Sequence, residues 1–364
     1  MGKYFIYHMK KTAVRFAVMA LFLLVIVNTT VVRHYTSSFS GEEVYNVSLA
    51  AFATFSIIAP AAVAALEFSQ FMNRRNLDTW YSLPVSRRDL FIVHFGNGAV
   101  QLVLSVLVSA FLAAFKISRY PALDLADTAV YFAYAIGAML LIYMLYTFFF
   151  VSANNVFDGC VFMFGAYIIP RCVFAIFRNF YYAANSSRGH LGIYDTELPF
   201  DGNGIFSTIA KLSTRYESLI EPVRTRRGID MPEIKIPEVS IPQAFVWTMI
   251  CIVALAGAVY VFTTKKTEVV SGVSESWFGY RILIPLCTAS ALNSSALAAG
   301  AMMEDPVMGI GLSLVGLIPS FIGVFVAYVI FRRGVKFKIS DLISVGAVVV
   351  FYVASLLIFR VLLG

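Results

Sequence analysis

The sequence predicts an all-α membrane protein, a polytopic bundle of about nine transmembrane helices. Its 364 residues are 59% hydrophobic and only 13% charged, with a mean hydropathy of +0.79. A soluble domain has roughly 25% charged residues. Continuous apolar runs of about 20 residues recur along the chain, whereas an outer-membrane barrel would show short segments of alternating hydrophobicity. We therefore expect a helical bundle rather than a soluble core or a barrel.

Nine segments have the length and hydropathy of membrane spans. They are residues 13–32, 44–66, 90–115, 128–151, 157–178, 243–263, 278–303, 306–331 and 342–363. The first follows Lys10, Lys11 and Arg15, as the apolar part of a signal peptide would. It lacks a small-residue cleavage site and further spans follow, so we expect an uncleaved first helix.

The basic residues of the short loops predict the orientation of the chain. With the N-terminus in the cytoplasm, nearly all of them fall on the cytoplasmic side. They are Lys3, Lys10, Lys11, Arg74, Arg75, Arg87, Arg88, Lys265, Lys266, Arg332, Arg333, Lys336 and Lys338. We therefore expect the N-terminus inside and the C-terminus outside. The net charge of +7 then reflects the excess of basic residues in cytoplasmic loops, so it is no sign of a nucleic-acid partner.

Residues 179–242 form the only long hydrophilic segment, and the order of the spans places it outside. Within it, apolar residues recur at helical spacing from position 209 to position 223, which predicts an amphipathic helix. That helix would either lie on the outer membrane surface or pack against the rest of the segment. Pro232, Pro237 and Pro242 then favour an extended connector into the sixth span.

Motifs for catalysis and metal binding are absent from the sequence. The histidines, His8, His34, His94 and His190, are widely separated and form no HExxH motif, and neither GxSxG nor a P-loop occurs. The cysteines lie inside apolar runs without CxxC spacing. We expect no enzyme activity, no disulfide, no metal site and no cofactor in this chain. Any energy from ATP would have to come from another chain.

Two polar positions inside spans are candidates for a substrate path. Arg171 follows Pro170 in the fifth span, and either faces such a path, pairs with an acid such as Glu304, or extends to the outer surface. Asn97 is the second candidate, although it lies one helical turn from Gln101 and the pair favours interhelical hydrogen bonds over ligand binding.

Three further charged residues, Glu67, Asp158 and Arg281, lie at the cytoplasmic ends of spans. We interpret them as anchors at the membrane boundary.

The cytoplasmic segment between the second and third spans has an organised pattern. "EFSQFMNRRNLDTWYSL" predicts a short helix with an apolar stripe, and Pro84 ends it. Ser86 and Asp89 then form a capping box that begins the third span. The stripe consists of Phe68, Phe71, Met72, Leu77, Trp80 and Tyr81. Anchoring at the membrane boundary would explain the arginines and aromatic residues. It would not explain why a short helix is ended by a proline and followed by a capped start of the next helix.

With this segment the chain resembles the permeases of ATP-binding-cassette (ABC) exporters of the bacterial second type, also called type V exporters. The resemblance rests on the basic amphipathic lead-in, on "NLDTWYSLPVSRRDLF", on the long external segment, and on "YVFTTKKTEVVSG" at residues 260–272. Residues 1–264, with the external segment, match the six-helix core of the family. Residues 265–364 add a cytoplasmic connector and three further helices.

The resemblance implies a coupling helix that docks on a separate ABC ATPase subunit, and that this partner binds the ATP and magnesium. Its ATPase-coupling residues here are Leu77, Asp78, Trp80, Tyr81, Leu83, Pro84, Arg87 and Arg88, and a second cytoplasmic contact is formed by Lys265, Lys266 and Glu268. It also implies a homodimer or heterodimer of permeases among the lipids of the bacterial cytoplasmic membrane. Two alternatives are a secondary transporter, which would be expected to contain inverted repeats, and a membrane scaffold or sensor that uses the external segment.

Overall fold

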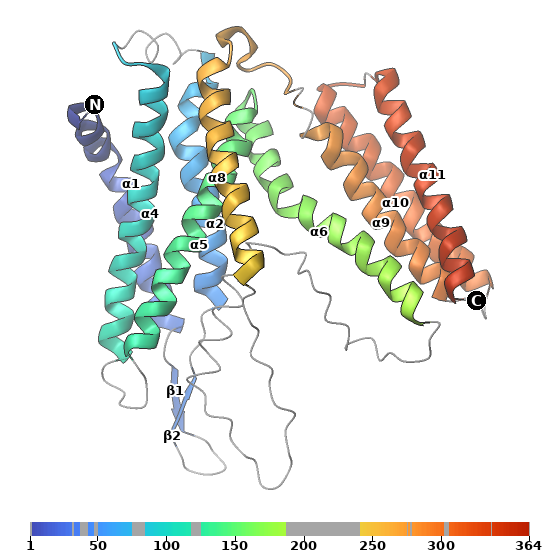
Figure 1. The fold of residues 1–364 in the computed structure, drawn as a ribbon, viewed down its shortest axis with the longest axis horizontal. Helices are drawn as coiled ribbons and strands as arrows, with labels where there is room; N and C mark the ends of the chain where they lie inside the picture. The colour runs from blue at the N-terminus through green and yellow to red at the C-terminus, as the bar shows by residue number, and fades with distance from the viewer. Residues whose placement is uncertain are drawn as a thin grey trace. The chain divides into compact units, whose positions relative to one another are not determined.

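The computed structural model describes residues 2–30, 33–36, 43–46, 50–74, 84–117, 125–186, 241–274, 276, 279–301, 306–335 and 337–363. The long helices within these residues are drawn in Figure 1. They are α1 (Gly2–Thr30), α2 (Ala50–Phe68), α4 (Arg87–Ile117), α5 (Leu125–Ser152), α6 (Val156–Ser186), α8 (Ile241–Thr264), α9 (Tyr280–Ala301), α10 (Pro306–Arg332) and α11 (Ile339–Leu363). The amphipathic helix expected at residues 207–223 lies outside the described residues.

The predicted all-α membrane fold is confirmed. Eight helices in the described part of the chain, all of those above except α1, are long and apolar enough to cross a membrane, judged by length and composition. The chain is therefore a multi-pass helical membrane protein. A bilayer offers the backbone no hydrogen-bond partners, so each span satisfies its own N–H and C=O groups as a helix.

Two of the predicted boundaries are corrected. The lead-in before the first span is continuous with it, because α1 begins at Gly2. The second span begins at Ala50 rather than at residue 44, because Glu43–Asn46 forms strand β2. This strand pairs antiparallel with β1 (Arg33–Thr36), and their adjacent aromatic and β-branched residues favour the extended conformation.

The helices group into two compact units, Met1–Ser152 with Gly204–Glu268 and Ala153–Asn203 with Val269–Gly364. In the first unit α4 contacts α1, α2, α5 and α8, and α8 packs on α5 although it follows much later in the chain (Figure 1). The largest fully buried side chains of this unit include Phe52, Phe68, Phe91, Tyr143 and Phe150. Aromatic rings thus fill much of this core, between smaller alanine, valine and leucine side chains.

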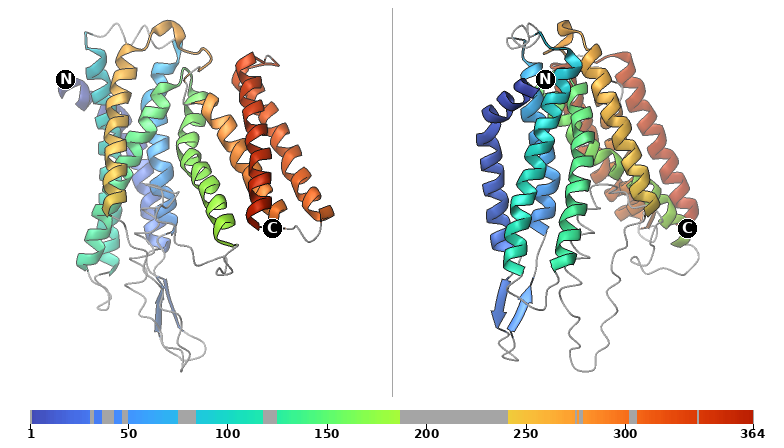
Figure 2. Two further views of the ribbon diagram at one scale, coloured as in Figure 1. Left: turned by 45° about the vertical axis from the view of Figure 1, so that its right-hand side comes forward. Right: turned by 60° about the vertical axis from the view of Figure 1, so that its left-hand side comes forward.

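In the second unit α9 contacts α6, α10 and α11 (Figure 2). Its core contains Leu292 of α9, Phe359 of α11 and Ala183 of α6. The sequence-based division assigns residues 1–264 to one part and residues 265–364 to another. The contacts instead group α6 with the last three helices.

Candidate functional sites

The first candidate site is the segment between α2 and α4, which the sequence predicts to be cytoplasmic and of which part is described. Leu77, Asp78, Trp80, Tyr81 and Leu83 lie outside the described residues. On the near side of that gap, Phe68, Phe71 and Met72 are buried, as the apolar stripe predicts, and a 3₁₀ turn at Ser69–Met72 extends α2. On the far side Pro84 is exposed.

The predicted restart of the chain at α4 is confirmed. The backbone N–H of Asp89 donates to Oγ of Ser86 at 3.1 Å, which makes Ser86 the N-cap of α4. Such a cap satisfies one of the helix N–H groups that have no partner within the helix. The first turn of α4 is therefore a defined structural element rather than a frayed end.

The two stretches that the sequence predicts to form cytoplasmic contacts lie side by side in the first unit. Arg87 donates from Nη1 to the carbonyl oxygens of Lys265 at 2.9 Å and Thr263 at 3.5 Å. Arg74 donates from Nη2 to the carbonyl oxygen of Glu268 at 3.3 Å. Carbonyl groups at a helix end lack intrahelical donors, so the Arg87 guanidinium caps α8.

Lys265 also faces inward. Its Nζ donates to the carbonyl oxygen of Val151, at the end of α5, at 3.0 Å, and burial lowers the pKa of Lys265 to about 8. Lys266 and Glu268 are exposed, as is Arg88. The predicted contact residues therefore divide into two groups: Arg87 and Lys265 connect helices, and Arg88, Lys266 and Glu268 face outward.

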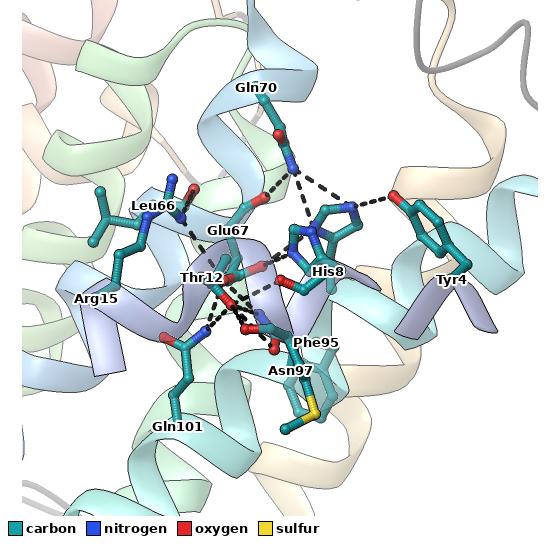
Figure 3. Close-up of polar contacts among 12 residues, drawn as sticks. Tyr4, His8, Thr12, Arg15, Leu66, Glu67, Gln70, Phe95, Asn97 and Gln101 are labelled. Carbon is teal, nitrogen blue, oxygen red and sulfur yellow. Dashed lines mark hydrogen bonds and ion pairs between the residues drawn. The ribbon is translucent and has the colours of Figure 1, made fainter. Parts of the chain in front are cut away.

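The second candidate site is a buried polar cluster at which α1, α2 and α4 meet (Figure 3). Its centre is Glu67 of α2, whose side chain is 1% exposed. Oε2 of Glu67 lies 2.8 Å from Nε2 of His8 and 3.2 Å from Nδ1 of His94. The two imidazole rings stand edge to face, with their centroids 4.1 Å apart. Three titratable side chains from three helices thus share one enclosed site.

Amide groups of α4 hold the other carboxylate oxygen of Glu67. Asn97 donates to Oε1 at 3.0 Å and Gln101 donates to it at 3.3 Å, and both amides also donate to the hydroxyl of Thr12 on α1 at 3.1 Å. These bonds confirm the predicted interhelical role of Asn97 and Gln101. Arg15, also on α1, places Nη1 3.9 Å from Oε1 and is partly exposed.

Tyr4 and Gln70 also lie close to the ring nitrogens of His94. The Tyr4 hydroxyl lies 3.2 Å from Nε2 of His94, and the Gln70 amide nitrogen lies 3.2 Å from Nδ1. Burial, together with the nearby Glu67 carboxylate, raises the pKa of Tyr4 to about 12, so the hydroxyl keeps its proton at neutral pH. When that hydroxyl donates to Nε2, the proton of a neutral His94 is on Nδ1, toward Glu67.

This cluster changes the interpretation of Glu67, which is not an anchor at a boundary but a buried acceptor. The pairing could not be predicted from the sequence, because His8 and His94 lie 86 positions apart and share no motif. A weaker signal was present in α4, where His94, Asn97 and Gln101 recur at spacings of three and four residues and so occupy one face of the helix. That polar stripe inside an apolar span indicated that a neighbouring helix supplies polar side chains to bond with it.

The other charged residues singled out in the spans lie in the second unit. Asp158 accepts hydrogen bonds from the hydroxyls of Ser274 at 2.6 Å and Tyr280 at 2.9 Å, so it joins the start of α6 to the segment before α9 and to the first residue of α9. Arg171 stacks over the ring of Tyr167, one turn earlier on α6, at 3.9 Å from the ring centroid.

These contacts revise the boundary interpretation of Asp158, which is buried. A role for Arg171 in a substrate path stays a prediction. Its proposed partner Glu304 lies outside the described residues.

The fold and the two sites define a multi-pass helical membrane protein in which Ser86 caps α4, Arg87 joins α4 to the end of α8, and a histidine–glutamate cluster is buried. Comparison with protein-family models, with curated proteins and with solved structures finds no match.

Proposed function

We propose that this chain is the membrane subunit of an ATP-driven exporter in the bacterial cytoplasmic membrane, and that it couples a substrate path to a separate ATPase subunit. The observation that supports the proposal best is the joint between the cytoplasmic turn and α8, where Arg87 donates to the carbonyl oxygen of Lys265 at 2.9 Å. The sequence carries no nucleotide-binding motif, so the work of ATP hydrolysis has to arrive through a contact with another chain.

A coupling contact needs a firm connection to the helices that move. Ser86 caps α4, and three aromatic side chains, Phe68 of α2, Phe91 of α4 and Phe262 of α8, form a mutual cluster just beside it. Their ring centroids lie 5.3 to 6.0 Å apart. A displacement applied to the turn would therefore reach all three helices at once, because packed aromatic side chains transmit strain.

Coupling also requires that the ATPase bind the turn differently in its different nucleotide states. Exposed residues are available for such a contact, whereas residues engaged inside the subunit are not. Arg88 is exposed and the neighbouring Arg87 is engaged with α8. In this proposal Arg88 contacts the ATPase, and Arg87 holds the turn on the bundle.

Affinity purification of the full-length protein from its native membrane tests the proposal. We expect an ATPase subunit to copurify with the wild type and to be lost from a Trp80→Ala, Arg88→Glu double variant. Lys116→Glu is the matched control, because it reverses a charge at the opposite end of α4. It should retain the partner. If no ATPase copurifies with the correctly folded wild type, or if the double variant retains it fully, the proposal is wrong.

The buried cluster favours a second candidate, a proton-coupled secondary transporter. Ionisable side chains within membrane helices commonly form proton relays, and Glu67, His8 and His94 are in mutual contact. Transport into vesicles driven by a pH gradient, without ATP, would support this candidate over the exporter. A scaffold or sensor function would depend on residues 187–240, which are outside the described part of the chain.

A further inference from the structure

We propose that His8, Glu67 and His94 form a binding site for a divalent transition-metal ion, with zinc as the ion of choice. The proposal does not depend on the exporter function. It rests on the donor atoms, their spacing, their burial and the groups around them.

Two of the three distances between donor atoms are close to the spacing that zinc requires, and the third is at most 4.8 Å. Zinc bonds to histidine nitrogen and carboxylate oxygen measure about 2.0–2.2 Å, so ligand atoms of a tetrahedral site stand roughly 3.3–3.5 Å apart. Here Oε2 of Glu67 is 2.8 Å from His8 and 3.2 Å from His94, and the ligand atoms all lie within 4.8 Å of one another. Small rotations of the side chains would open the space for an ion between them.

The donor set also matches the ion. Two imidazoles and one carboxylate are a known zinc set that leaves a fourth position open, and imidazole favours zinc, copper, iron and nickel over magnesium or calcium. All three side chains are buried, at 5%, 1% and 0% exposure for His8, Glu67 and His94. A buried carboxylate with two imidazoles is therefore an arrangement that a cation would stabilise.

Further side chains hold the ligands in place, as in established metal sites. Asn97 and Gln101 donate to Oε1 of Glu67, which directs Oε2 toward the histidines. The Tyr4 hydroxyl lies 3.2 Å from Nε2 of His94, so it can accept a hydrogen bond from Nε2–H once Nδ1 binds the ion. His94 would then carry its single ring proton on Nε2 instead of Nδ1 and stay neutral.

Binding would have a structural consequence. His8 lies on α1, Glu67 on α2 and His94 on α4, so the ion would crosslink three helices of the first unit (Figure 3). The N-terminal turns of α1 would gain a connection to the bundle beyond their hydrogen bonds. An ion that binds only the folded protein stabilises it by mass action.

The test uses full-length protein in detergent, purified through an affinity tag that contains no histidine. After treatment with a chelator, the protein is equilibrated with Zn²⁺, desalted and assayed for metal by mass spectrometry. We expect about one zinc ion per chain, from a single three-ligand site. Cobalt substitution gives a second readout: Co²⁺ should produce the intense visible absorption of a tetrahedral site, and X-ray absorption of the zinc form should show imidazole ligands.

Variants assign the site to these residues. His8→Gln and His94→Gln should each lower zinc affinity at least 100-fold, whereas His190→Gln, the same change in the long hydrophilic segment, should leave it unchanged. Tyr4→Phe should lower it about 10-fold, the lower end of the range for second-sphere partners. The proposal is overturned if the wild type retains no more zinc than His8→Gln, or if the cobalt and zinc spectra show an octahedral site without imidazole. These spectra are recorded on the wild type, so they decide the question even if a variant fails to fold.

Discussion

Glu67 is a buried carboxylate near the end of a helix that is otherwise apolar. A carboxylate in such a position is tolerated because hydrogen-bond donors surround it. Removing one member of a buried pair destabilises a protein more than replacing both members by apolar residues does. Among the described residues, the side chains that bond to the Glu67 carboxylate lie on α1 and α4, so Glu67 links both helices to α2. They are His8, Arg15, His94, Asn97 and Gln101.

We expect Glu67→Ala to destabilise the metal-free protein by about 3 kcal/mol, because it leaves two buried imidazoles and two amides without their acceptor. Glu67→Gln keeps an acceptor oxygen and should cost less. Thermal unfolding in detergent with a chelator present measures both. Equal melting temperatures for the wild type and Glu67→Ala would contradict the assigned role of the cluster.

Lys265 predicts a pH dependence of stability. Burial lowers its pKa from 10.5 to about 8, so between these values the unfolded chain binds more protons than the folded protein does, and folding stability rises with pH. In Lys265→Met this contribution is absent. The melting temperature of the wild type relative to Lys265→Met should therefore increase from pH 8 to pH 10, as measured at constant ionic strength. A difference that stays constant over this range would show that Lys265 titrates normally.

At the scale of elements, α4 organises the first unit because each of its faces meets a different neighbour. Its polar face carries His94, Asn97 and Gln101 and meets α1 and α2. Gly98 is on a tightly packed face, where a Cβ atom would lie 2.8 Å from Cγ1 of Val63 on α2 and would overlap the hydroxyl of Tyr143 on α5. The close approach of these helices depends on that missing side chain.

We therefore expect Gly98→Ala to destabilise the protein by about 1–3 kcal/mol through overpacking. Gly137→Ala is the matched control, since it lies in α5 and a Cβ there meets no atom within 4 Å. That variant should be neutral or more stable by about 0.5–1 kcal/mol, because alanine favours the helix over glycine. Thermal unfolding of the two variants side by side checks the prediction. A Gly98→Ala protein as stable as Gly137→Ala would contradict the packing.

At the scale of the whole molecule, the two compact units interleave along the chain. The fifth long helix, α6, belongs with α9, α10 and α11, while α8 belongs with the first four helices. Within the second unit Cys172 of α6 and Cys287 of α9 place their sulfur atoms 3.8 Å apart. This pair reports directly on whether α6 packs against α9.

We expect an added oxidant such as copper phenanthroline to join Cys172 and Cys287 in a disulfide. To detect it, a protease site is inserted between residues 187 and 240, so that α6 and α9 fall on different fragments after cleavage. The fragments should stay linked on a non-reducing gel and separate on a reducing one. Cys172→Ser should abolish the link, whereas Cys160→Ser should leave it intact. Fragments that separate without reductant would contradict the packing of α6 on α9.

The local features of this protein follow from its sequence alone. Apolar runs of bilayer length become helices because, within a bilayer, the backbone N–H and C=O groups can form hydrogen bonds only with one another. The described spans lie close to the predicted ones. Ser86 caps the start of α4, as the sequence predicts. Asn97 and Gln101 donate hydrogen bonds to Glu67 on another helix, as their spacing indicated. Each of these depends on residues within a turn or two of one another, or on the hydrophobicity of one segment.

The tertiary structure decided which distant groups meet. It brought His8 and His94 onto Glu67, placed Arg87 on the end of α8, and grouped α6 with the last three helices. No short pattern specifies these pairings, since in a chain of uniformly apolar helices many faces are equally suited to packing. Buried polar side chains then select among the packings, because each needs a partner at hydrogen-bond distance and a mismatched face would leave it without one.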